Sequence, residues 1–313
     1  MKMIHSGRRA GLVLASAALL LPAWGASAQS PAGRAGAQDP RWAAVRRVFG
    51  LEGETEDGYF RVNFPRTDLH VKIGDVTLEP EFELTSYFGF APVGKDSVLA
   101  MGEVIVRQRE VNGALEEARR RGVSVTALHN HLVGEAPRIM YMHVMAEGRA
   151  DSVAAKLRAV LAATPTPVHP AQEKEAAKAD WSAVDAVLGK PEEAEGRTAE
   201  YVFPRRESHS VHGVPLRSSG VLETASEVVF QQIGAGRVAC GGELYLRPRE
   251  VEPVMDALEA AGLRVTALHN HMLDEQPTMY WMHWYGTGSA PALARGVAAA
   301  LSRMNGAVKS VGS

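Results

Sequence analysis

The chain has 313 residues, of which 46% are hydrophobic and 22% are charged, a composition typical of a soluble globular protein with about two domains. Its formal net charge of −2 argues against nucleic acid or an anionic membrane surface as a partner. The single cysteine, Cys240, excludes a disulfide within the chain.

Residues 1–28 have the features of a secretory signal peptide. A positively charged start precedes an apolar stretch, and Ala26-Ser27-Ala28 offers small residues for cleavage. The apolar stretch is too short to span a membrane well. We therefore expect a periplasmic or secreted protein that begins near Gln29, with a disordered lead-in over residues 29–39. No cysteine stands at the cleavage site, so we expect no lipid anchor.

The first folded unit is predicted over residues 40–165. Two segments, Phe82–Phe90 and Val98–Arg107, alternate or run apolar between Gly and Pro residues and predict strands. Glu110–Arg121 places apolar residues on one face and ends at Gly122, which predicts a helix with a glycine stop. The remaining predicted elements are a strand over Val123–Leu132, a turn over 133–137, a strand over Arg138–Ala146 and a helix over Asp151–Leu161.

The same pattern recurs in a second unit, predicted over residues 179–308, after a linker over 166–178. Between residues 125–143 and 265–283, 11 of 19 positions are identical at a constant offset of 140. This internal duplication predicts an α+β fold of two tandem repeats, each a mostly antiparallel sheet packed against helices. It also suggests that the repeats pack about a pseudo-twofold axis, as in an isologous dimer. The strand order stays open.

The duplicated segment concentrates histidines at repeated positions. His129 and His131 point to one face of a strand, and His143 can join them only if the hairpin pairs odd residues with odd. A turn centred on Glu135 or Ala136 achieves this register and places a carboxylate beside the imidazoles. The predicted metal ligands are His129, His131, His143, His269, His271 and His283. Glu135 and Glu275 are predicted either as further ligands or as catalytic bases.

Neutral imidazole with carboxylate suits a divalent transition metal, and the pattern does not choose among zinc, iron, manganese and copper. The sequence leaves open whether the six histidines form two sites or one shared site. A metal-dependent hydrolase, in which Glu135 or Glu275 is the base for a metal-activated water, and an oxygen-handling enzyme both fit. Buried histidines that only hydrogen-bond to one another or to carbonyl groups are the structural alternative.

Other repeated polar residues are candidate substrate contacts. Arg107 and Arg247 can pair with a substrate carboxylate or phosphate, or equally with a neighbouring Glu. Tyr141 and Trp281 can line a groove for a substrate. In the alternative function, a non-catalytic protein binds a small molecule or a cell-envelope polymer through such a groove. The repeat also matches Glu83 with Glu223 and Glu103 with Glu243 at an offset of 140, and His70 with His209 at 139.

Two family resemblances concern the histidine motif. The His-x-His-x3-Glu spacing is similar to the first cupin motif, but in cupins no helix precedes the motif and the last histidine lies much further on. The duplicated Ala-Leu-His-Asn-His with its downstream Met-His resembles the LppY/LpqO family of exported bacterial proteins over almost the whole mature chain. That resemblance implies an extracytoplasmic location and a duplicated architecture, without an established activity. The members that name the family are lipoproteins, whereas this chain lacks the lipid-accepting cysteine.

Overall fold

The computed structural model describes residues 39–169, 177–234 and 236–304. The predicted signal peptide, all but the last residue of the lead-in, the middle of the linker and the end of the second unit lie outside these ranges. None of the described helices is long and apolar enough to cross a membrane.

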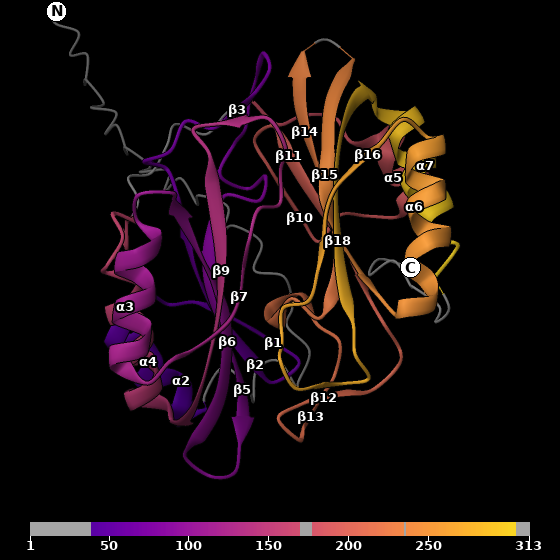
Figure 1. The fold of residues 1–313 in the computed structure, drawn as a ribbon. Helices are drawn as coiled ribbons and strands as arrows, with labels where there is room; N and C mark the ends of the chain where they lie inside the picture. Colours follow the sequence, from indigo (N-terminus) through magenta and orange to yellow (C-terminus); the bar gives the residue numbers. More distant parts are fainter. Residues whose placement is uncertain (1–38, 170–176, 235, 305–313) are drawn as a thin grey trace, which may run out of the picture.

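Each repeat forms one six-stranded antiparallel sheet covered by three helices, which confirms the predicted fold class (Figure 1). The strand order in the first repeat is β1-β2-β5-β6-β9-β7. Its strands are β1 (Glu54–Glu56), β2 (Tyr59–Pro65), β5 (Thr85–Val93), β6 (Ser97–Arg107), β7 (Ser124–His129) and β9 (Ile139–Arg149). Its helices are α2 (Pro40–Phe49), α3 (Val111–Arg121) and α4 (Ala150–Leu161).

The second repeat has the same topology, with the order β10-β11-β14-β15-β18-β16. Its strands are β10 (Glu193–Glu195), β11 (Thr198–Pro204), β14 (Ala225–Gly234), β15 (Arg237–Leu246), β16 (Arg264–His269) and β18 (Tyr280–Ser289). Its helices are α5 (Ser182–Leu188), α6 (Val251–Ala260) and α7 (Ala290–Leu301), together with the short turns η1 (Gly220–Leu222) and η2 (Pro248–Glu250).

A three-stranded sheet accompanies each large sheet and holds the turn that follows the histidine motif. The first contains β3 (Lys72–Ile73), β4 (Val76–Thr77) and β8 (Glu135–Ala136). The second contains β12 (His209–Val211), β13 (Val214–Leu216) and β17 (Glu275–Gln276). The pattern of the sequence did not predict these short strands or β1, β2 and α2.

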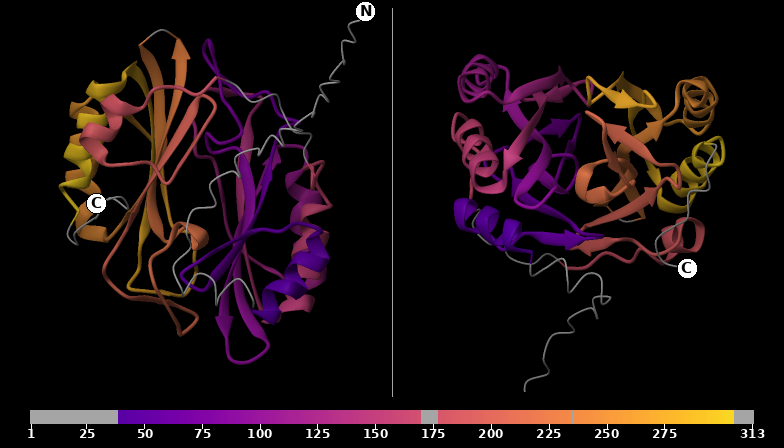
Figure 2. Two further views of the ribbon diagram at one scale, coloured as in Figure 1. Left: turned by 180° about the vertical axis from the view of Figure 1, so that it is seen from behind. Right: turned by 90° about the horizontal axis from the view of Figure 1, so that it is seen from below.

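The two sheets face each other in the centre of the molecule, and the helices lie on the two outer sides (Figure 2). Apolar residues fill the space between helices and sheet in each repeat, including Trp42, Phe88 and Leu157 in the first. Two further clusters join the repeats, and one of them packs the Phe82 and Tyr285 rings with their centroids 6.1 Å apart. Because each sheet is covered on both faces, a polar side chain on its inner face is buried and needs a partner.

The histidine hairpins have the predicted register. In the first repeat His129 lies opposite Tyr141 and Ala127 lies opposite His143, so odd residues pair with odd around a turn centred on Glu135. A bulge lies between Val125 and Ala127. The predicted strand over Val123–Leu132 ends earlier, at His129, because the chain turns there and the Asn130 side chain donates to the Leu132 carbonyl at 2.9 Å.

Candidate metal centre

The two repeats bring their histidine motifs together, because β7 and β16 are edge strands of the two facing sheets. Histidine rings from the two repeats stack across the repeat boundary. The duplication relates the members of one stacked pair, His129 and His269, whereas the other two pairs are crossed. The centroid distances are 3.4 Å for His129–His269, 3.6 Å for His131–His283 and 3.7 Å for His143–His271. The six predicted histidines therefore form one cluster that both repeats share, which we call the histidine cluster.

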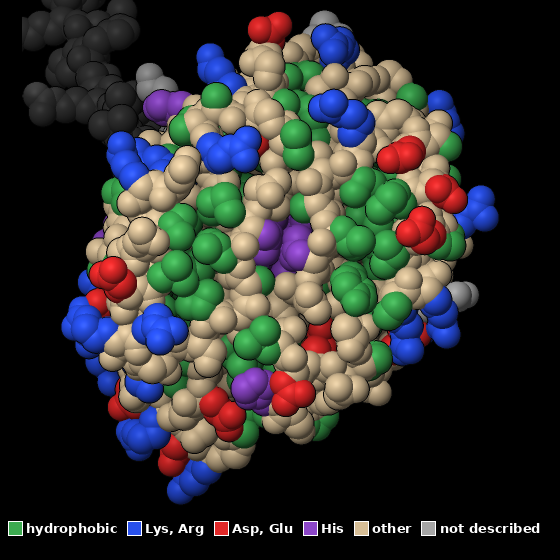
Figure 3. Space-filling view, viewed as in Figure 1, with side chains coloured by type: hydrophobic (Ala, Val, Ile, Leu, Met, Phe, Trp, Pro, Cys, Tyr) green, Lys and Arg blue, Asp and Glu red, His purple; other side chains and the backbone are tan. Residues whose placement is uncertain are grey.

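The histidine cluster is buried except at one end. His131, His143, His271 and His283 are at most 4% exposed, whereas His129 and His269 are half-buried. Histidine side chains are visible at the centre of one face of the molecule, with apolar side chains on both sides (Figure 3). The cluster thus lies beneath a narrow opening on this face.

Most of the ring nitrogens in the cluster lack a hydrogen-bond partner among the described residues. These atoms are both nitrogens of His131, His269, His271 and His283, and the Nε2 atoms of His129 and His143. Buried polar atoms are normally paired, so ring nitrogens that form no hydrogen bond of good geometry are available as metal ligands. Burial, with nearby histidines adding to it, lowers the pKa of His129 to about 2 and that of His143 to about 3. These imidazoles are neutral at physiological pH, the form in which they bind a metal.

Three glutamates complete the cluster. Glu83 places Oε2 3.3 Å from His131 Nδ1 and Oε1 3.5 Å from His283 Nδ1. Glu103 Oε2 lies 3.1 Å from His143 Nε2 and 3.4 Å from His131 Nε2. Glu243 Oε2 lies 3.8 Å from His271 Nε2 and 3.7 Å from His283 Nε2.

Several sets of these side chains could hold a metal ion, because their ligand atoms lie within 4.8 Å of one another. One set combines Glu83 with His131 and His283, and another combines Glu103 with His131 and His143. Other sets consist of histidines alone, such as His129, His131 and His269.

The sequence reasoning missed Glu83, Glu103 and Glu243 as candidate ligands. Glu103 and Glu243 lie on the inner faces of β6 and β15, directly opposite His143 and His283. The duplication already contained the signal, because each glutamate recurs at an offset of 140. Strand order was needed to show that these positions meet the histidines.

The predicted carboxylates lie in the turns after the histidines. Glu135 and Glu275 are buried in β8 and β17. Glu275 accepts a hydrogen bond of 2.5 Å from the Tyr245 hydroxyl, and burial raises the pKa of Glu275 to about 7. Their predicted roles as ligand or base stay predictions.

Of the predicted substrate contacts, the aromatic pair lies against the cluster. The Tyr141 ring stacks on His131 at 3.5 Å, and the Trp281 ring stacks on His271 at 4.0 Å. The arginines instead lie beside acidic partners: Arg107 pairs with Glu110, and Arg247 lies 3.3 Å from Glu207. This geometry matches the ion-pair alternative for Arg107 and Arg247.

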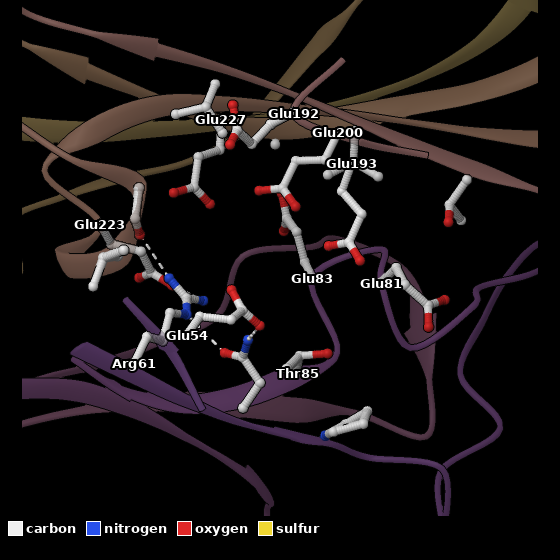
Figure 4. Close-up of a pocket in the computed structure, with 18 of the residues that line it drawn as sticks. Glu54, Arg61, Glu81, Glu83, Thr85, Glu192, Glu193, Glu200, Glu223 and Glu227 are labelled. Carbon is white, nitrogen blue, oxygen red and sulfur yellow. Dashed lines mark hydrogen bonds and ion pairs between the residues drawn. The ribbon is translucent and has the colours of Figure 1, made fainter. Parts of the chain in front are cut away.

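A cavity of about 690 Å³ lies between the two sheets and reaches the cluster. Twelve glutamates and two arginines line it, and its lining includes His131, His283, Glu83, Glu103 and Glu243. Several of the glutamates point toward one another from opposite sheets (Figure 4). The set formed by Glu83, His131 and His283 is therefore accessible from an acidic chamber.

A family model matches each repeat once, over residues 43–163 and 182–303. The chain belongs to the family described as Domain of Unknown Function (DUF1259). No curated protein and no solved structure matches the chain. The family match establishes the duplication and leaves the function to be argued from the site.

Proposed function

We propose that the protein is a metal-dependent enzyme whose divalent transition metal is bound by Glu83, His131 and His283. The observation that carries this proposal is the position of this set, with ligand atoms within 4.8 Å of one another beside the cavity. Two histidines and one carboxylate leave coordination positions free for water or substrate.

Two reaction classes use this ligand set. Zinc held by two histidines and a carboxylate activates water for hydrolysis, and iron(II) held in the same way activates oxygen. The remaining histidines of the cluster would position the ligands or hold a second ion. A base is required in the hydrolytic case, and Glu135 and Glu275 stay our candidates because they belong to the turns that carry His131 and His271. Substitution of each by Gln, with activity and metal content measured separately, tests that role.

The second candidate function is non-catalytic binding of a small molecule or a cell-envelope polymer. Two pairs of exposed apolar residues related by the duplication favour it: Leu128 with Leu268, and Val133 with Leu273. Leu128 and Leu268 directly precede His129 and His269, the two half-buried histidines of the cluster. Such a protein would bind its ligand without turnover and after metal removal.

We further propose that the protein is exported and related to the LppY/LpqO proteins, as the sequence resemblance suggests. N-terminal sequencing of the protein recovered from the periplasm or the medium tests this, and a mature start near Gln29 is the expected result. Retention in the cytoplasm with an intact N-terminus would contradict it.

Metal content tests the enzyme proposal directly. We expect near-stoichiometric metal in protein purified without an affinity tag, measured by elemental mass spectrometry, and its loss in a His131→Ala/His283→Ala variant of confirmed fold. The control is His70→Ala, which removes an exposed histidine. Protein that stays metal-free after reconstitution with zinc, manganese, iron and copper would refute the proposal.

A further inference from the structure

The pseudo-twofold symmetry of the cavity is broken by two substitutions between the repeats. Arg61 corresponds to Glu200, since Arg61 lies opposite Gly89 and Glu200 lies opposite Val229 in the matching strand pairs. Tyr87 corresponds to Glu227, since they lie opposite Glu103 and Glu243. A cationic and an aromatic side chain in one half are thus replaced by two carboxylates in the other.

In the half that contains Arg61, the protein supplies its own cation. The Arg61 guanidinium lies 3.4 Å from Glu223 Oε1, donates to the Gly220 carbonyl at 2.7 Å and stacks over the Tyr87 ring at 3.9 Å. The Tyr87 hydroxyl donates to Glu223 Oε2 at 2.5 Å. Both oxygens of the Glu223 carboxylate therefore have donors.

The other half has carboxylates at the same positions. Glu83 is the counterpart of Glu223, and its side chain is 9% exposed. Its oxygens form no hydrogen bond among the described residues and have only the Nδ1 atoms of His131 and His283 at 3.3 and 3.5 Å. Glu227 Oε1 and Glu243 Oε1 are likewise buried without a partner. All three residues line the cavity, and Figure 4 shows Glu83 close to Glu200.

Among the described residues no arginine or lysine forms an ion pair with Glu83, Glu200 or Glu227, and Arg61 acts on Glu200 and Glu227 only from across the cavity. Burial, with repulsion from Glu200 and Glu223, raises the pKa of Glu227 well above its ordinary value. A buried charge without a counter-ion is costly, so a bound cation would stabilise this arrangement.

We propose that this half of the cavity binds a small organic cation, whose ammonium or guanidinium group takes the position that corresponds to the Arg61 guanidinium. Glu200 and Glu227 would accept its hydrogen bonds, and Glu83, as a ligand of the proposed metal, would mark the boundary between this position and the metal centre. A volume of about 690 Å³ suits a small organic molecule better than a single ion. A group with several N–H donors also satisfies carboxylates that come from different directions.

Because the cavity also reaches His131 and His283, the bound cation would lie beside the metal centre. The inference that this cation, a primary amine or a guanidine, is the substrate of the enzyme rests on the proposed function. Binding of the cation itself does not depend on metal chemistry.

The test is calorimetric titration of the full chain with agmatine and with spermidine at low and high ionic strength. We expect saturable binding of at least one probe that weakens with added salt. A Glu200→Gln/Glu227→Gln variant should bind about tenfold more weakly, since it loses two charge-assisted contacts. Glu252→Gln/Glu259→Gln, which removes two exposed charges on α6, should bind as the wild type does.

A second variant places the two residues of the first repeat, Arg and Tyr, at the matching positions of the second repeat. Glu200→Arg/Glu227→Tyr should abolish probe binding, because the introduced guanidinium would fill the position itself, and it should keep or raise the thermal stability. Undiminished binding in this folded variant would overturn the proposal, as would wild-type protein that binds only Mg²⁺ or Ca²⁺ in the cavity. Metal content is measured in parallel, so that a metal-free wild type that still binds the probes refutes only the proposed function.

Discussion

Glu83 and Glu223 occupy equivalent positions in the two repeats but contact different partners. Glu83 lies beside His131 and His283, whereas Glu223 pairs with Arg61. We expect Glu83→Gln to lower metal affinity by at least about tenfold, since a neutral amide replaces an anionic ligand. Glu223→Gln should instead lower thermal stability while metal affinity is retained, because it leaves Arg61 without its buried counter-charge. Competition with a chromogenic chelator measures the affinities, and equal losses of affinity in both variants would contradict the assignment.

His209 is a second residue whose burial has a measurable consequence. Burial lowers the pKa of His209 from 6.5 to about 4, so between these pH values the unfolded chain binds a proton that the native state excludes. Acid should therefore destabilise the native state progressively as the pH falls from 6.5 to 4, by about 3 kcal/mol in total from this residue. We expect the difference in unfolding free energy between wild type and His209→Leu to change by that amount over this range.

Chemical denaturation at a series of pH values measures this difference. His70→Leu, which removes an exposed histidine at the equivalent position, is the matched control. A constant difference between wild type and His209→Leu across the range would show that His209 is not protected from protonation.

At the residue scale the sequence predicts the histidines better than the carboxylates. The His129, His131 and His143 pattern combines the period of a strand with a repeat, and both signals are local. Glu83 and Glu103 reach the same point only through the order of β5, β6 and β9 and through the contact between repeats. Those are long-range pairings that local periodicity does not specify.

At the scale of single elements, Gly102 shows how tightly β6 is packed beside Glu103. A Cβ atom at this position would overlap the Tyr87 carbonyl oxygen and the Phe88 ring on β5. We expect Gly102→Ala to destabilise the fold by about 1–3 kcal/mol, which is typical of overpacking in a core.

Gly113 in α3 is the matched control for this change. A Cβ atom there meets nothing within 4 Å, so Gly113→Ala should stabilise the protein by up to about 1 kcal/mol through helix propensity. Urea denaturation measures both changes. If neither substitution lowered the free energy of unfolding, β5 and β6 would have to move apart to make room for the added methyl group.

The long elements were predictable because their apolar patterns are strong. The predicted helices over Glu110–Arg121 and Asp151–Leu161 correspond to α3 and α4 within one residue at each end. The strand predicted over Phe82–Phe90 corresponds to β5, which begins three residues later than predicted, at Thr85. The preceding residues form a turn, in which Leu84 N donates to the Pro80 carbonyl at 2.9 Å and Glu83 has φ 56°. The two-residue strands β3 and β8 pair across some sixty residues of sequence, and nothing local in either of them predicts that pairing.

At the scale of the whole molecule, the duplication predicted two similar units and a pseudo-twofold arrangement but not which faces meet. Each sheet has an apolar face toward its helices and a second buried face toward the other repeat. Only the second face contains the histidines and glutamates. The histidines and glutamates of the cluster therefore lie where the two repeats meet. On the other face of each sheet the helices pack directly, so side chains of the second repeat could not reach a metal there.

A centre built from both repeats couples its occupancy to the stability of the entire chain. His131 comes from one repeat and His283 from the other, so unfolding of either repeat destroys the proposed site. An ion that binds only the native state adds about 2.7 kcal/mol at a free concentration of 100 times its Kd. For a chain of this size we expect chelation to lower Tm by about 4–5 °C.

Scanning calorimetry with and without EDTA measures this effect, and the metal-loaded protein should unfold in one transition. The His131→Ala/His283→Ala variant should be insensitive to the chelator. If EDTA shifted only one of two separate transitions, the metal would belong to a single repeat. The ligands would then have to come from one histidine hairpin and its own Glu103 or Glu243, rather than from the boundary between the repeats.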